Sequence, residues 1–135
     1  MPTIPEDMLT AAKAVLRNAY APYSHFPVAV CIRSTSNQLF VGCNVENAAY
    51  PVGNCAEASA ISHMITQGYR DIKEILILVA GEKFCPPCGA CRQRLIEFAP
   101  LDLPIHLCST EGDYYLSTLK ELMPVAFGPE HLEKP

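Results

Sequence analysis

Three cysteines and one glutamate in this sequence have the types and spacing of a catalytic metal site. Cys55 and Glu57 are two residues apart, and Cys88 and Cys91 follow as a Cys-x-x-Cys pair. Three thiolates can hold one zinc ion and leave its fourth position open for water, which then loses a proton near neutral pH. Glu57 is the right kind of group to carry that proton. The spacing therefore predicts one zinc ion per chain, bound by the three thiolates, with Glu57 as the catalytic acid and base.

Each half of this motif is expected at the start of a helix. The positive end of a helix dipole favours an anion, so a helix that opens at Cys55 would stabilise its thiolate. Glu57, in the same first turn, could then reach the zinc-bound water without binding the metal. Pro87 suits a turn that closes as a second helix begins, where Cys88 and Cys91 share one face. Two helix starts are therefore expected to converge on one anionic site.

The cysteines also admit two other interpretations. Cysteine is often buried as a small apolar residue, which would make the spacing coincidental. Cys85 and Cys88 form a Cys-x-x-Cys of their own, which could be a redox pair. That interpretation leaves Cys55 and Glu57 unexplained, so we expect Cys85 to be a bystander. The other thiols lie in apolar, strand-like runs and are expected in the core: Cys31, Cys43 and Cys108.

Composition and charge favour a compact enzyme that acts on a small molecule. The chain has 135 residues, 50% of them hydrophobic, which is enough for one domain with a real core. Its net charge is -4 and it has no Lys/Arg cluster, which disfavours a nucleic-acid partner. Residues 1–7 contain neither a basic region nor an apolar stretch, and no apolar run approaches membrane-spanning length. With thiols that fit a reducing compartment, we expect a cytoplasmic protein without a signal peptide or a membrane partner.

Hydrophobic periodicity predicts strands that alternate with helices. Helices are expected to start at Pro5 and Ser117 and to cover residues 55–67 and 88–98. Strands are expected at residues 28–32, 39–43, 75–80, 105–108 and 114–116, the first two as a hairpin. The run 75–80 is the most apolar and is expected at the centre, covered on both faces. The alternation predicts a single α/β domain over residues 1–135, with a central mixed five-stranded sheet flanked by helices.

Further motifs resemble those of one enzyme family. Residues 20–24 read Tyr-Ala-Pro-Tyr-Ser and are followed by Phe26, and residues 42–50 read Gly-Cys-Asn-Val-Glu-Asn-Ala-Ala-Tyr. Residues 122–129 read Leu-Met-Pro-Val-Ala-Phe-Gly-Pro. Together with the zinc motif, which is a signature of zinc-dependent deaminases, they make residues 20–132 similar to the small, homotetrameric cytidine deaminases of the three-cysteine zinc class. The resemblance implies their three-layer fold.

The same resemblance implies an activity and a set of binding residues. The reaction is the hydrolysis of cytidine and 2'-deoxycytidine to uridine and 2'-deoxyuridine plus ammonia, in pyrimidine salvage. Zinc-bound hydroxide attacks C4 of the cytosine ring, while Glu57 protonates N3 and helps ammonia leave. A homotetramer with shared sites is implied, in which Tyr50 and Phe127 reach a neighbouring subunit's site. The implied nucleoside contacts are Phe26, Asn44, Glu46, Tyr50, Ala56 and Phe127.

Asn44 and Glu46 are the narrower part of this resemblance, since the family uses such a pair to recognise ribose. Two residues apart on an extended segment, their side chains point the same way. An amide and a carboxylate offer the donor and acceptors that suit paired hydroxyls. The alternative is that both side chains simply face water on a loop after the hairpin.

The chain departs from the family next to the catalytic glutamate. Related enzymes often carry Arg there, but this chain has Ala58. A zinc ion with three thiolates has a net charge of minus one, which a nearby cation would moderate. Arg92, directly after Cys91, is the expected replacement. Arg94 lies about 200° further around a helix and is expected to face solvent.

Three rival functions remain open from the sequence. A deaminase of aminonucleoside antibiotics would keep the zinc motif, but we would not expect the Asn44/Glu46 pair in it. A tRNA or editing deaminase would need a basic surface that this acidic chain lacks. A non-catalytic zinc or redox module would make Glu57 merely an acid favoured by the helix N-terminus. Ammonia release from cytidine, measured together with metal content, separates these alternatives.

Overall fold

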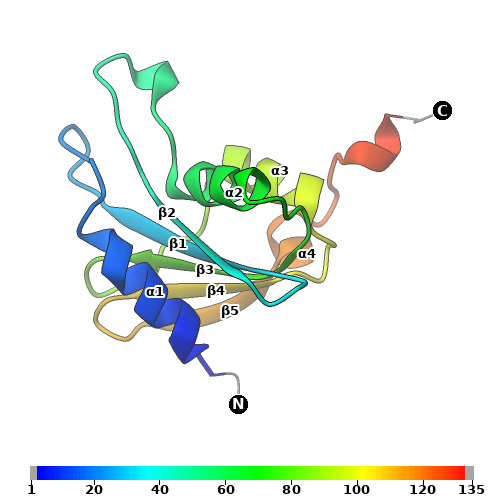
Figure 1. Ribbon diagram of the computed structural model, residues 1–135, viewed down its shortest axis with the longest axis horizontal. Helices are drawn as coiled ribbons and strands as arrows, with labels where there is room; N and C mark the ends of the chain where they lie inside the picture. The colour runs from blue at the N-terminus through cyan, green and yellow to red at the C-terminus, as the bar shows by residue number, and fades with distance from the viewer. Residues whose placement is uncertain (1–2, 133–135) are drawn as a thin grey trace.

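The computed structural model describes residues 3–132, which form a mixed sheet with helices on both faces (Figure 1). The helices are α1 (Glu6–Leu16), α2 (Ala56–Thr66), α3 (Gly89–Phe98) and the short α4 (Leu119–Leu122). The strands are β1 (Val28–Ser34), β2 (Leu39–Cys43), β3 (Ile72–Val79), β4 (Pro104–Ser109) and β5 (Tyr114–Thr118). Single 3₁₀ turns lie at Tyr50–Val52 and Pro129–His131.

The five strands pair in the order β2-β1-β3-β4-β5. β1 is antiparallel to β2 and β3, β5 is antiparallel to β4, and β3 and β4 are parallel. A parallel pair needs a crossover, and α3 supplies it between β3 and β4. The expected mixed five-stranded sheet is confirmed, with β3 at its centre.

Alternating residues of the central strands supply two separate cores. Val30 and Ile77 belong to the cluster that packs with α2 and α3, whereas Cys31 and Leu76 belong to the cluster that packs with α1. This is the period-two pattern of a sheet buried on both faces. β3 is accordingly buried along its apolar run, and the three-layer arrangement is confirmed (Figure 1).

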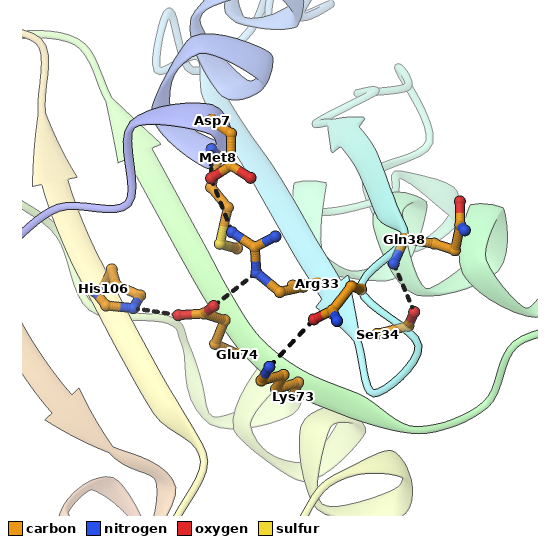
Figure 2. Close-up of polar contacts among 9 residues, drawn as sticks. Asp7, Met8, Arg33, Ser34, Gln38, Lys73, Glu74 and His106 are labelled. Atoms are coloured by element: carbon orange, nitrogen blue, oxygen red, sulfur yellow. Dashed lines mark hydrogen bonds and ion pairs between the residues drawn. The ribbon is translucent and has the colours of Figure 1, made fainter.

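A polar network fixes α1 to the sheet (Figure 2). The Arg33 guanidinium donates from Nη2 to Asp7 Oδ1 at 2.8 Å and from Nε to Glu74 Oε2 at 2.7 Å. The other oxygen of Glu74 lies 2.9 Å from His106 Nε2. The network therefore joins α1 to β1, β3 and β4 on the face away from α2.

α2 packs unusually close to β2, which sets the position of its N-terminus. A Cβ built on Gly42 would lie 2.4 Å from the Ala60 nitrogen and 2.8 Å from the Ala56 oxygen. Only glycine allows this approach of strand and helix backbones. The contact holds the first turn of α2, with Cys55 as its N-cap, beside the sheet.

The expected elements agree with the structure to within a few residues at their ends. The last helix is a single short segment, α4, which starts after Thr118, and the two 3₁₀ turns were not expected. Among the residues described, no helix is long and apolar enough to cross a membrane. The expectation that residues 1–7 form no signal peptide falls partly on residues 1 and 2, which lie outside the described part. A single domain over residues 1–135 stays a prediction.

Candidate active site and metal centre

A cavity of about 370 Å³ lies at the end of β3, between the N-termini of α2 and α3. This volume is within the range of small-molecule sites, ~300–1,000 Å³. The cavity is lined by Phe26, by residues of the segment 42–50 and by both halves of the zinc motif, together with β3 and the Pro86-Pro87 turn. Of the predicted site residues it includes Phe26, Asn44, Glu46, Tyr50, Cys55, Ala56, Glu57, Cys88 and Cys91.

Two sulfurs and one carboxylate converge at this cavity. The Sγ atoms of Cys55 and Cys91 are 2.7 Å apart, and a carboxylate oxygen of Glu57 lies within 4.8 Å of both. Cys55 is the N-cap of α2 and Cys91 lies in the first turn of α3, so two helix N-termini point at the same place. Glu57 and Cys91 are buried, and soft sulfur ligands beside an acidic group suit zinc.

The environment favours the thiolate of Cys55. Its hydrogen bond with Cys91, the backbone N–H of Ala58 and the positive charge of Arg94 together lower the pKa of Cys55 to about 6. The same contact with Cys55, followed by burial, raises the pKa of Cys91. Of the two, Cys55 is therefore the more acidic thiol and the one that more readily supplies a thiolate to a metal.

Glu57 is almost fully shielded from solvent, with a relative exposure of 5%. Burial is the main cause that raises the pKa of its carboxyl group, and the negative charge of Cys55 adds to the effect. A carboxyl group held in this way can be protonated closer to neutral pH than an ordinary glutamate. Its location supports the predicted role in proton transfer.

Cys88 is placed differently from the other two predicted ligands. It is the N-cap of α3 and lines the cavity, but it is exposed and stands outside the group of converging ligand atoms. Cys85 also lines the cavity, and its Sγ contacts the Pro86 carbonyl. All seven cysteines are free, and Cys31 and Cys108 are buried in strands as expected, whereas Cys43 is half-buried.

The structure corrects the expected source of positive charge. Arg92 donates from Nε to the Pro87 carbonyl at 2.7 Å and from Nη1 to the Leu122 carbonyl at 3.0 Å, so it braces the turn before α3. Arg94 is exposed, as expected, but its Nη1 lies 3.4 Å from Sγ of both Cys55 and Cys91. Arg94 follows Cys91 by three residues, and residues three apart on a helix share a face, so its side chain can reach the sulfurs.

Asn44 is buried and bonded to backbone. Its Oδ1 accepts from the Val28 N–H at 2.9 Å, and its Nδ2 donates to the Phe26 carbonyl at 2.9 Å. The side chain therefore fixes the segment that carries Phe26, whose half-exposed ring lines the cavity. This bracing role could not be predicted from the sequence, because the bonded partners are distant in the chain.

Glu46 organises the neighbouring loop. Its Oε1 accepts from the Tyr23 and Ser24 N–H groups at 3.0 and 3.1 Å, and its Oε2 from the Ser24 hydroxyl. The Ser24 hydroxyl is the leading cause that lowers the pKa of this carboxyl group. Tyr50 packs edge-on against Tyr23 at a ring-centroid distance of 6.1 Å. Glu46 is thus a half-buried carboxylate at the cavity wall, held by the loop of Tyr23 and Ser24.

Phe127 is the one predicted contact that does not line this cavity. It is half-exposed and stacks on His131, and its carbonyl accepts from Gln93 Nε2 at 2.9 Å. Tyr50 is 76% exposed although it lines the cavity of its own chain. Both rings therefore offer apolar surface to solvent in the single chain.

Comparison with known proteins places the whole arrangement in a family. Residues 2–107 match the family described as the cytidine and deoxycytidylate deaminase zinc-binding region. The chain is 36% identical over 127 residues to the cytidine deaminase of Sporosarcina psychrophila, covering 94% of this chain and 93% of that protein. It is 38% identical over 114 residues to that of Halalkalibacterium halodurans, covering 84% and 86%.

Solved structures agree with the sequence relatives. The cytidine deaminase of Burkholderia pseudomallei superimposes with a TM-score of 0.86 at 37% identity, covering 93% of this chain and 100% of that one. The cytidine deaminase of Mycobacterium leprae gives a TM-score of 0.77 at 35% identity, covering 90% and 99%. The likeness thus extends over at least nine-tenths of this chain.

Proposed function

The chain belongs to the cytidine and deoxycytidylate deaminase family, and we propose that it hydrolyses cytidine and 2'-deoxycytidine to uridine and 2'-deoxyuridine with release of ammonia. The observation that carries this proposal is the convergence of Glu57 with the sulfurs of Cys55 and Cys91 at the cavity. Ammonia release from cytidine, with zinc content measured on the same preparation, tests it. A zinc-loaded protein that releases no ammonia from either nucleoside would contradict it.

The residues present fit the zinc ion that this family uses. Cys55, Cys88 and Cys91 would hold it, because each lies at or within the first turn of a helix that opens on the cavity. When bound, zinc supplies the Lewis acidity that makes water a nucleophile near neutral pH. The acidic Cys55 thiol and the two helix N-termini support a site built for an anionic ligand set.

Glu57 is proposed to move the protons of the reaction. It takes a proton from the water that adds to C4 of the cytosine ring and delivers it to N3. It then carries the proton of the new C4 hydroxyl to the exocyclic amino group. The bond from C4 to that nitrogen breaks, ammonia leaves and the C4 carbonyl of uridine forms, so that one water is consumed for each ammonia released. Burial of the carboxyl group supports this role, because it raises the pKa of Glu57 toward the range in which a carboxyl group can both accept and return protons.

The cavity wall is proposed to recognise the nucleoside. Phe26 offers a ring face for the pyrimidine, and Ala56 begins α2 beside it with its backbone at the cavity. Glu46 offers carboxylate oxygens for the ribose hydroxyls. Asn44 holds the segment that carries Phe26 and keeps one N–H and one lone pair of its amide for the same hydroxyls. A carboxylate whose pKa is lowered by the Ser24 hydroxyl is a strong acceptor of hydroxyl hydrogens, which supports recognition of the sugar.

Replacing Glu46 by alanine is expected to lower kcat/KM for cytidine by about 10-fold or more, with little loss for free cytosine. Only the nucleoside offers the hydroxyls that Glu46 would bind. Because Glu46 also holds Ser24, Ser24→Ala is the matched control: it removes that contact and keeps the carboxylate. Equal losses on both substrates, or an equal loss in the Ser24 variant, would show that Glu46 only shapes the loop.

A homotetramer with shared sites and a cytoplasmic location in pyrimidine salvage complete the proposal. Exposed aromatic and aliphatic side chains gather on the segments around the cavity and after α4, which is the kind of surface that an interface buries. They include Tyr20, Tyr23, Tyr50, Val52, Val125 and Phe127. Seven free cysteines support a reducing compartment.

Replacing Phe127 by alanine is expected to lower activity while bound zinc is unchanged. The ring is half-exposed and lies outside the cavity of its own chain, so a neighbouring subunit is where it would act. Light scattering of the parent should give about four times the chain mass of 14.8 kDa. A fully active monomer at the assay concentration would contradict the shared site.

A further inference from the structure

The guanidinium group of Arg94 lies against the two sulfurs that converge at the cavity. Its Nη1 is 3.4 Å from Cys55 Sγ and 3.4 Å from Cys91 Sγ, so one nitrogen bridges the N-termini of α2 and α3. Arg94 follows Cys91 by three residues, which places both on one face of α3. Arg94 is otherwise exposed, so its side chain approaches the two sulfurs from the solvent side.

Arg94 makes this contact although carboxylates are available to it. Glu97 lines the same groove between α2 and α3, three residues further along the helix. Among the carboxylates of residues 3–132, none forms an ion pair with Arg94, and its hydrogen bonds go to sulfur. The guanidinium is thus directed at the cysteines and not at its acidic neighbour.

The charge balance of the site explains why a cation is useful there. Three thiolates around one zinc ion give the loaded site a net charge of minus one. A fixed positive charge a few ångströms away favours the loaded state over the empty one. Hydrogen-bonded partners of metal ligands typically change metal affinity by ~10–100-fold.

The groove also shows where a second cation could act in the same way. Ala58 lines it together with Arg94, and the Ala58 N–H already donates to Cys55. A cation carried at position 58 would therefore start from the same groove as Arg94 and beside Cys55.

We propose that Arg94 is a positioning residue that fixes the sulfurs of Cys55 and Cys91 and offsets the negative charge of the thiolates, and so sets the affinity of the site for zinc. The inference rests on the proposed zinc site. It assigns to Arg94 the charge-compensating role that the sequence predicted for Arg92. Arg92 serves the backbone instead, through the carbonyls of Pro87 and Leu122.

The test is the zinc dissociation constant, measured by chelator competition at fixed pH, so that catalysis is not needed. Arg94→Gln is expected to weaken zinc binding by roughly 10–100-fold. Arg94→Lys should retain part of the affinity, because it keeps the charge but loses the planar donor. Arg70→Gln, which removes an exposed arginine elsewhere, is the matched control and should bind as the parent does.

Rescue separates a charge effect from a simple loss of folding. The double variant Ala58→Arg/Arg94→Gln is expected to regain most of the affinity lost in Arg94→Gln. With cobalt in place of zinc, loss of the N–H···S contacts should move the thiolate-to-metal absorption bands to longer wavelength. If Arg94→Gln does not fold, the Lys and double variants carry the test.

Two results would overturn the inference and leave the proposed function intact. The first is parent-like zinc affinity in Arg94→Gln. The second is binding as weak in both Arg94→Lys and Ala58→Arg/Arg94→Gln as in Arg94→Gln, because then neither charge nor its place matters. If the parent itself takes up no zinc and releases no ammonia from cytidine, the proposed function fails first.

Discussion

Replacing Glu57 by glutamine is expected to lower kcat for cytidine by at least about 100-fold while zinc stays bound. The amide keeps the shape of the carboxyl group, which is 5% exposed at the first turn of α2, but it cannot accept or return a proton. Because the sulfurs of Cys55 and Cys91 are untouched, the metal site should survive. Ammonia release and zinc content, measured on the same sample, give both readouts.

A matched control makes the loss specific to that carboxylate. Glu111→Gln removes one exposed carboxylate from the turn before β5 and does not alter the cavity, so its activity should equal that of the parent. Near-normal turnover in the Glu57 variant with metal retained would remove Glu57 from the mechanism. The buried acid would then be only a favourable N-terminal charge of α2.

The parts of the fold that depend on local patterns could be predicted from the sequence. The apolar run around Ile77 is long and flanked by polar turns, so its place as the central strand follows from periodicity alone. Gly68 follows the end of α2 with a φ of 97°, a left-handed conformation that glycine adopts readily. A glycine at this place in the sequence therefore predicts the end of the helix. Cys55 and Cys88 were expected at helix starts, and both are N-caps.

The contacts that the sequence missed all join segments that are distant in the chain. Gly42 reads as an ordinary strand glycine until α2 is packed against it, and only then does its missing side chain matter. Asn44 was expected to bind sugar, and its bonds to the backbone of Val28 and Phe26 were not predicted. The turn at Tyr50–Val52 carries a signal that could have been used, since Pro51 favours the start of such a turn.

The helix α3 was predicted correctly, but the arginine expected beside the thiolates was Arg92 and not Arg94. α3 was predicted to within one residue and both helix starts were expected to converge on one site, but the position of Arg94 was judged relative to Arg92 and not relative to Cys91. The bridging contact needs Cys55 of α2, whose position depends on the packing of α2 on the sheet. Local geometry could have identified Cys91 as a partner, but Cys55 requires the tertiary structure.

Replacing Cys88 by alanine is expected to abolish bound zinc, whereas Cys85→Ala should leave one zinc per chain. Both thiols are free and line the same cavity, so the two variants are matched in chemistry and differ in position. Cys88 is the N-cap of α3, close enough that its charge acts on Cys91 and Arg94.

The reason for the difference is the number of ligands that remain. Without Cys88 only two thiolates are left, which is fewer than the three protein ligands of a catalytic zinc site. Cys85 contacts only the neighbouring Pro86 carbonyl, so its loss removes no ligand from the proposed set. Elemental analysis after dialysis against a weak chelator measures zinc per chain in both variants. An empty site in Cys85→Ala with zinc retained in Cys88→Ala would reverse the ligand assignment and return Cys85 to the metal centre.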